Sequence, residues 1–165
     1  MDIQRFQARM ATPFAVLGIS TDERFITGVE FLPLGTPILV PKKNSLAQLL
    51  CVQLNAYIEN PGFKFDLPLK LTGTQHQIKV WEALCRIPHG EARTYGELAV
   101  QLKSAPRAVG QACGRNPLPV VVPCHRVVAA GGSLGGFMGG VGMEQLGIKR
   151  WLLRHEGCTP TARPQ

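Results

Sequence analysis

Cys124 is followed directly by His125 and Arg126, so that a thiol, an imidazole and a guanidinium are adjacent in the chain. A cysteine is a strong nucleophile only as the thiolate, which a nearby base or positive charge favours. Because neighbours in an extended segment point to opposite faces, we expect a water molecule, rather than a direct hydrogen bond, to carry a proton from Cys124 to His125. The same three residues also fit a second interpretation, in which Cys124 is a small buried residue next to a surface histidine.

Two helices before this cysteine have clear N-terminal signals. Residues 74–77 and 94–97 each begin with threonine and end with glutamine or glutamate, which is the spacing of a capping box. Apolar residues at helical spacing follow both segments. They predict helices over about 75–86 and 95–102.

A third helix is predicted over about 105–113, with Ser104 as its N-cap. The short connection to the preceding helix is typical of a helix-turn-helix. Residues 127–130 and 133–137 flank a pair of glycines and are expected to form a hairpin-like wing. With a last helix that ends near His155, these elements predict a mainly α, winged helix-turn-helix C-terminal domain.

The N-terminal part of the chain favours an α/β domain. Two β-rich runs separated by a polar turn predict a hairpin, and a helix begins at Asn44 or Ser45 and ends at Asn60. Alternating apolar residues over 63–69 predict a further edge strand. We place the domain boundary after residue 71, which gives domains over 1–71 and 72–165.

Charge divides the chain in the same way. Residues 1–70 contain seven Lys and Arg against six Asp and Glu, whereas residues 71–165 contain eleven against five. A basic domain attracts polyanions such as DNA, because its cations release counterions from phosphates, although a solvated basic surface is an equally good interpretation of composition alone.

Composition also bears on the compartment. The longest uncharged stretch, 127–143, contains seven glycines and cannot span a membrane. The five cysteines form no CxxC pair, and the first ten residues lack the apolar core of a signal peptide. We therefore expect a cytoplasmic protein without a membrane partner.

The sequence 121–127, Val-Val-Pro-Cys-His-Arg-Val, resembles the active-site motif of the O6-alkylguanine-DNA alkyltransferases, also called methylated-DNA–protein-cysteine methyltransferases. The similarity extends over about residues 72–157. It also includes Gly73-Thr74, Val80-Trp81-Glu82-Ala83-Leu84, Thr94-Tyr95-Gly96-Glu97-Leu98-Ala99, Arg107-Ala108-Val109-Gly110, Gly114-Arg115-Asn116-Pro117 and Trp151-Leu152-Leu153-Arg154-His155-Glu156-Gly157.

The resemblance implies a role for each candidate catalytic residue. Cys124 would attack the alkyl carbon on guanine O6, and His125 would take the thiol proton through a water. Glu156 would hold the imidazole of His125 in the required tautomer. Asn116 would fix the active-site segment by hydrogen bonds, and the phenol of Tyr95 would donate to the departing guanine or contact a neighbouring phosphate.

The resemblance also implies double-stranded DNA as the partner, bound through its minor groove with the damaged base flipped out. Arg107 would fill the space that the base leaves. The other residues expected at the DNA surface are Tyr95, Gly96, Ala105, Ala108, Gly110 and Arg115. The guanine pocket would include Val127, Phe137 and Met138. Three of the candidate residues also have an ordinary interpretation. Arg107 could be a phosphate contact, Asn116 a turn residue, and Glu156 a partner of Arg154 or of a lysine.

Further expectations follow from this chemistry. The product thioether is not hydrolysed, so we expect each protein molecule to act once. We also expect no cofactor, no metal and a monomer. Several positions depart from the family pattern: the connection over 102–107 is shorter, and residues 142–147 resemble an insertion before the last helix. The alternative functions are a non-catalytic, alkyl-lesion-binding or regulatory DNA-binding protein and, less favoured, a cysteine hydrolase.

Overall fold

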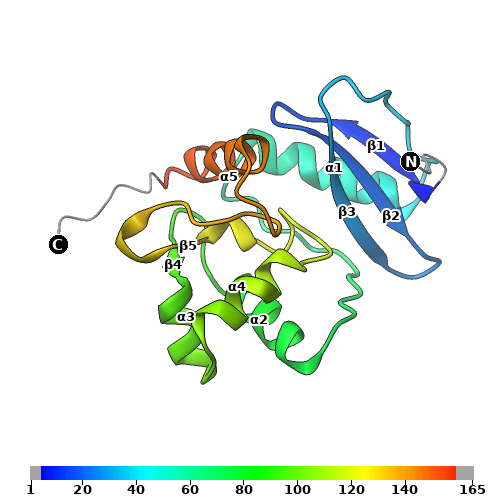
Figure 1. Cartoon of the computed structure of the whole chain (residues 1–165). Coiled ribbons are helices and arrows are strands. Elements are labelled where there is room, and N and C mark those ends of the chain that lie inside the picture. Colours follow the sequence, from blue (N-terminus) through cyan, green and yellow to red (C-terminus); the bar gives the residue numbers. More distant parts are fainter. Residues whose placement is uncertain (1–4, 159–165) are drawn as a thin grey trace. The chain divides into compact units, whose positions relative to one another are not determined.

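The computed structural model describes residues 5–158 of the 165-residue chain. The chain divides into two compact units, Met1–Leu71 and Thr72–Gln165 (Figure 1). Among the described residues, no helix combines the length and the apolar character that crossing a membrane requires.

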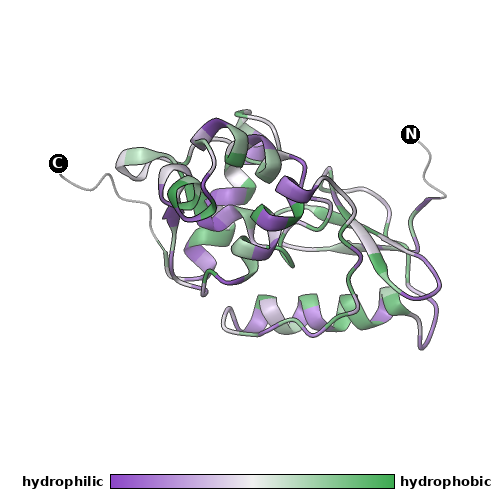
Figure 2. Cartoon of the chain, turned by 90° about the horizontal axis from the view of Figure 1, so that it is seen from below, coloured by the Kyte–Doolittle hydropathy of each residue, from purple (hydrophilic) through white to green (hydrophobic). Residues whose placement is uncertain are grey.

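The first unit consists of an antiparallel sheet and one helix. Strands β1 (Ala8–Ala11), β2 (Val16–Thr21) and β3 (Ile26–Leu32) lie in the order β1-β2-β3 (Figure 1). Helix α1 (Leu46–Glu59) contacts all three strands. Because one apolar stripe of α1 faces the sheet, its hydropathy alternates along the helix (Figure 2). The predicted hairpin is confirmed as β2 and β3, whereas strand β1 was not predicted.

Of two local expectations in this unit, one is confirmed and the other is wrong. Ser45 is the N-cap of α1, because its hydroxyl accepts from the backbone N–H of Gln48. The strand predicted over 63–69 is wrong. Of that segment, only Leu69 forms an isolated bridge, to Ile26 of β3. The segment packs on α1 instead: the rings of Phe65 and Tyr57 lie 5.6 Å apart.

The second unit is mainly helical. Helix α2 (Gln75–Cys85) and helix α3 (Tyr95–Leu102) both begin with complete capping boxes, as predicted. Helix α4 (Pro106–Gly114) packs against both, and the indole N–H of Trp81 donates to the carbonyl of Ala112 at 2.9 Å. This hydrogen bond fixes α2 to α4 within the core.

The connection between α3 and α4 differs from the prediction at its cap. Ala105, whose methyl group can neither donate nor accept a hydrogen bond, is the N-cap of α4, and Pro106 begins the helix. The hydroxyl of Ser104 instead lies 2.8 Å from Nε2 of His76 on α2. Lys103 closes α3 in the left-handed conformation, with φ of 53°. A distant histidine therefore competes successfully for the hydroxyl that was expected to cap α4.

The region after the cysteine contains no hairpin wing. Strand β5 (Val127–Val128) pairs in parallel with β4 (Arg93–Thr94), and the predicted second wing strand, 133–137, is a loop. Because β5 ends at Val128, the pair Gly131 and Gly132, which take positive φ angles, does not connect two paired strands.

The last helix, α5 (Met143–His155), is confirmed at its C-terminal end. Residues 142–147, which resemble an insertion, do not precede this helix as expected. Gly142 is the N-cap of α5, and residues 143–147 form its first turns.

Candidate active site

Cys124 begins a short 3-10 turn, Cys124–Arg126, between segment 116–123, which itself contains a turn, and strand β5. Its side chain is buried but lines a cavity of about 360 Å³. The cavity lies within the second unit, with walls from α3, from α4 and from the loop before α5. Its lining residues are Tyr95, Pro106, Gly110, Cys113, Gly114, Cys124, Gly136, Phe137, Met138, Gly139, Gly140 and Val141.

The thiol of Cys124 is protonated at neutral pH in the resting protein. Burial raises its pKa to about 11, although a hydrogen bond from Asn116 and the charge of Lys149 act in the opposite direction. Its S–H lies 3.6 Å from the thioether sulfur of Met138, which can accept a weak hydrogen bond. Formation of the thiolate therefore needs a base.

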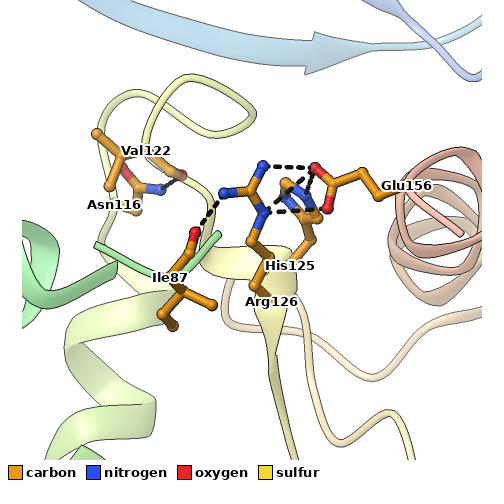
Figure 3. Close-up of polar contacts among 6 residues, drawn as sticks. All are labelled: Ile87, Asn116, Val122, His125, Arg126 and Glu156. Carbon is orange, nitrogen blue, oxygen red and sulfur yellow. Dashed lines mark hydrogen bonds and ion pairs between the residues drawn. The ribbon is translucent and has the colours of Figure 1, made fainter. Parts of the chain in front are cut away.

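His125 provides a base next to Cys124. Its ring is fully buried, and its Nε2 lies 2.8 Å from Oε1 of Glu156 (Figure 3). The other ring nitrogen, Nδ1, is buried and has no hydrogen-bond partner among residues 5–158. Burial lowers the pKa of His125, more than Glu156 raises it, so the ring is neutral at pH 7.

Glu156 determines which nitrogen of His125 carries the proton. Burial raises the pKa of this carboxyl, but hydrogen bonds from His125 and Arg126 outweigh burial and lower it to about 2. An ionised carboxylate can only accept, so Nε2 of His125 must donate to it. In the neutral ring, Nδ1 is then the basic nitrogen, free to take a proton through a water.

Arg126 completes this arrangement, although the sequence suggested it only as a positive charge beside Cys124. Its Nε lies 3.0 Å from Oε2 of Glu156 and its Nη2 2.7 Å from Oε1 (Figure 3). Its Nη1 also donates to the carbonyl of Ile87 at 2.5 Å. The guanidinium thus anchors the carboxylate against the end of α2 and keeps it ionised.

Asn116 holds the segment that leads to Cys124. Its Nδ2 donates to the carbonyl of Val122 at 2.8 Å, and its Oδ1 accepts from the backbone N–H of Leu118 at 2.9 Å. Within this clamped segment Val120 has φ of 75°, an unfavourable conformation for a β-branched residue. Two buried hydrogen bonds thus hold a strained turn directly before the nucleophile.

Tyr95 is the first residue of α3 and faces the same cavity. Its hydroxyl lies 3.4 Å from the carbonyl of Gly136, and burial raises its pKa to about 12. The phenol therefore stays protonated and can donate a hydrogen bond into the cavity.

A second hollow, with a volume of about 790 Å³, borders α4. Arg107, Ala108, Gly110 and Arg115 all line it, together with the start of α2, and no acidic residue does. The two hollows share Gly110, Gly114 and Gly139. A basic surface therefore adjoins the cavity of Cys124.

Other predicted site residues lie elsewhere. Gly96 and Ala105 line neither hollow. Phe137 and Met138 line the cavity, whereas Val127 is buried in β5 and offers its carbonyl to Lys149 instead. Lys149 itself was missed, because a lysine within the helical pattern of α5 gives no sign of burial, yet it is fully buried here.

Comparison with known proteins agrees with this geometry. The family profile described as 6-O-methylguanine DNA methyltransferase, DNA binding domain, matches residues 75–158. A methylated-DNA–protein-cysteine methyltransferase of Methanosarcina acetivorans is 38% identical over 158 residues, which are 92% of this chain and 98% of the relative. A protein of the same name from Mycobacterium tuberculosis is 50% identical over 95 residues. That match covers 56% of this chain and little more than half, 58%, of the relative.

A solved structure is similar over nearly the whole chain. The crystal structure of Mycobacterium tuberculosis OGT in complex with DNA has a TM-score of 0.75 and 36% identity, and the match covers 93% of each chain. The motif around Cys124, the profile match and the long similarity to the Methanosarcina protein agree. This chain belongs to the 6-O-methylguanine DNA methyltransferase family.

Proposed function

We propose that this chain repairs DNA by moving an alkyl group from O6 of guanine to the sulfur of Cys124. The observation that carries the proposal is the juxtaposition of Cys124, which lines the cavity, with the buried pair of His125 and Glu156. The name of the relatives, methylated-DNA–protein-cysteine methyltransferase, describes the same chemistry.

The residues divide the reaction between them. A water accepts the thiol proton of Cys124 and passes a proton to Nδ1 of His125, while Glu156 stabilises the resulting imidazolium. The thiolate sulfur then forms a bond to the alkyl carbon. The bond from that carbon to O6 breaks with its electron pair going to guanine, which takes up a proton and leaves neutral. Tyr95 lines the cavity, and its phenol can donate a hydrogen bond to that base.

The thioether that results is stable in water, because sulfur bound to an alkyl carbon has no carbonyl for water to attack. A second thiol, that of Cys113, lines the same cavity, but burial raises its pKa to about 12, so it stays protonated and is a poor acceptor for the group. Each protein molecule therefore acts once.

The surface beside the cavity suits DNA. Helices α3 and α4, joined by the turn at Lys103 and Ser104, form the helix-turn-helix of a winged-helix-like domain over 72–165, in which the loop 129–141 takes the place of a β-hairpin wing. We place α4 in the minor groove, because its small residues Ala108 and Gly110 allow close approach. Arg107 would occupy the stack after the damaged guanine has flipped into the cavity.

Replacement of the nucleophile tests this function. A Cys124→Ser variant should bind duplex DNA that contains O6-methylguanine but leave the lesion intact, as measured by chromatography of the hydrolysed DNA. Cys85→Ser, which changes an exposed thiol on α2, is the matched control and should repair normally. Wild-type protein that binds the lesion and never repairs it would instead support the non-catalytic lesion-binding function.

A further inference from the structure

The loop that lines the cavity contains a tight turn over residues 137–140. Its first and last residues each donate the backbone N–H to the carbonyl of the other, at 2.8 and 3.0 Å. The two central residues, Met138 and Gly139, have φ of 51° and 77°, and positive values at both positions are those of a type I′ turn. Because two hydrogen bonds close it, the turn is a rigid unit that carries the sulfur of Met138 to 3.6 Å from Sγ of Cys124.

Helix α4 supports this turn at Gly139. A Cβ added to Gly114, the last residue of α4, would lie 3.0 Å from both the Cα and the backbone nitrogen of Gly139. Only a glycine allows two backbones to approach so closely. The end of α4 is itself fixed, because the carbonyl of Ala112 accepts from the indole of Trp81 at 2.9 Å. A side chain at position 114 would therefore displace the turn by a few tenths of an ångström, rather than the helix.

Helix α5 supports the turn at the next residue. The side chain of Gln145, in the first turn of α5, covers the backbone of Gly140, where an added Cβ would lie 2.6 Å from its Nε2 and 2.8 Å from its Cδ. Gln145 is otherwise exposed, so that its truncation leaves the core intact. Two helices thus hold the turn at two successive glycines.

The position of the turn determines the space beside the nucleophile. Gly114 and Gly139 both line the cavity of Cys124, so the distance between α4 and the turn is one dimension of that cavity. Met138 lies against the sulfur itself, where the transferred group has to lie. A small movement of the turn therefore changes how large a group can reach the sulfur.

We propose that Gly114 and Gln145 are positioning residues that hold Met138 against Cys124 and so limit the size of the alkyl group that the sulfur accepts. Both act through the turn over 137–140. The role rests on the proposed function, because it concerns the specificity of the same sulfur. The space beside the sulfur is nevertheless a property of the cavity, and it can be measured without any alkylated guanine.

The first test compares the rates at which Cys124 reacts with methyl methanethiosulfonate and with benzyl methanethiosulfonate, followed by peptide mapping. Gly114→Ala pushes the turn away from α4, and Gln145→Ala removes its second support. Each should raise the ratio of benzyl to methyl rates by at least about threefold, less than the tenfold or more expected for a whole methylene group. Gly147→Ala, at a glycine of α5 with open space around it, is the control and should leave the ratio unchanged. An unchanged ratio in a folded variant overturns the role of the residue replaced, and the exposed Gln145 provides this result even if Gly114→Ala does not fold.

A second test asks whether the two supports act through Met138. In a Met138→Gly background there is no side chain left to position, so the addition of Gly114→Ala or Gln145→Ala should change the ratio by less than about twofold. Equal effects in both backgrounds would overturn the proposal, since a general loosening of the fold does not depend on Met138. The ratio of repair rates on duplexes with O6-benzylguanine and O6-methylguanine should change in the same direction. Failure of the proposed function would appear separately, as wild-type protein that leaves O6-methylguanine unrepaired while the methanethiosulfonate ratios still change.

Discussion

Nε2 of His125 and Oε1 of Glu156 lie 2.8 Å apart although 31 positions separate the two residues in the chain. This contact joins the turn that carries the nucleophile to the C-terminal end of α5, where Glu156 is the C-cap. It fixes the proton on Nε2 and leaves Nδ1 as the base. The chemistry of Cys124 therefore depends on where the last helix ends.

Replacement of Glu156 by glutamine should slow alkyl transfer by about a hundredfold, a typical contribution of an oriented general base. The amide has nearly the same shape as the carboxylate but cannot stabilise the imidazolium of His125. The measurement is the second-order rate constant for repair of O6-methylguanine in a duplex. Glu144→Gln, at an exposed position in the first turn of α5, is the control. Equal rates for Glu156→Gln and wild type would remove Glu156 from the mechanism.

Glu156 should also make stability depend on pH in the acid range. Its pKa in the folded protein is about 2, below the ordinary value of 4.5. The ionised carboxylate therefore contributes stability that is fully present above about pH 4.5 and is lost as the pH falls toward 2. The free energy of unfolding in urea should accordingly fall more steeply below pH 4.5 for wild type than for Glu156→Gln. Parallel pH profiles for the two proteins would show that the carboxylate is not stabilised by His125 and Arg126.

Met138 should limit the size of the alkyl group. Its sulfur lies 3.6 Å from Sγ of Cys124, next to the place where the transferred group has to lie. Its φ of 51° is one that glycine adopts without strain. Met138→Gly should therefore raise the rate on O6-benzylguanine relative to O6-methylguanine by about tenfold or more, the range for a few methylene-sized changes in a pocket. Met143→Ala, at an exposed methionine, should leave this ratio as it is. A ratio unchanged in Met138→Gly would place the alkyl group elsewhere.

Arg107 should matter for DNA and not for the free base. It is exposed near the start of α4 and lines the basic hollow beside the cavity. Arg107→Ala should reduce repair of O6-methylguanine in a duplex by about tenfold, because nothing then replaces the flipped base, whose unstacking costs a few kcal/mol. The rate on free O6-methylguanine should not change. Equal losses on both substrates would mean that Arg107 acts on the cavity itself.

The parts of the fold that short-range chemistry specifies were predictable. The capping boxes of α2 and α3 involve residues three positions apart, and the structure contains both. The prediction at Ser104 is wrong because its hydroxyl is bound by His76, 28 positions away, a contact that local pattern cannot reveal. The strand over 63–69 is wrong for a similar reason, since Phe65 packs against Tyr57 of α1.

The candidate site divides in the same way. Cys124 and His125 were visible as neighbours, and the resemblance to the family supplied Asn116, Tyr95 and Glu156. Lys149 has no such signal, because its burial depends on three carbonyls 13 to 22 positions away in the chain. The wing was predicted from two short runs on either side of Gly131 and Gly132, but β5 ends at Val128, before the glycine pair.

The central claim is that Cys124 accepts the alkyl group, and intact mass spectrometry after incubation with a duplex containing one O6-methylguanine tests it most directly. The mass should rise by a single methyl group per protein molecule, on the peptide that contains Cys124, while the lesion becomes guanine. Tight binding of the duplex without any gain in mass, or a methyl group on a peptide without Cys124, would contradict the account.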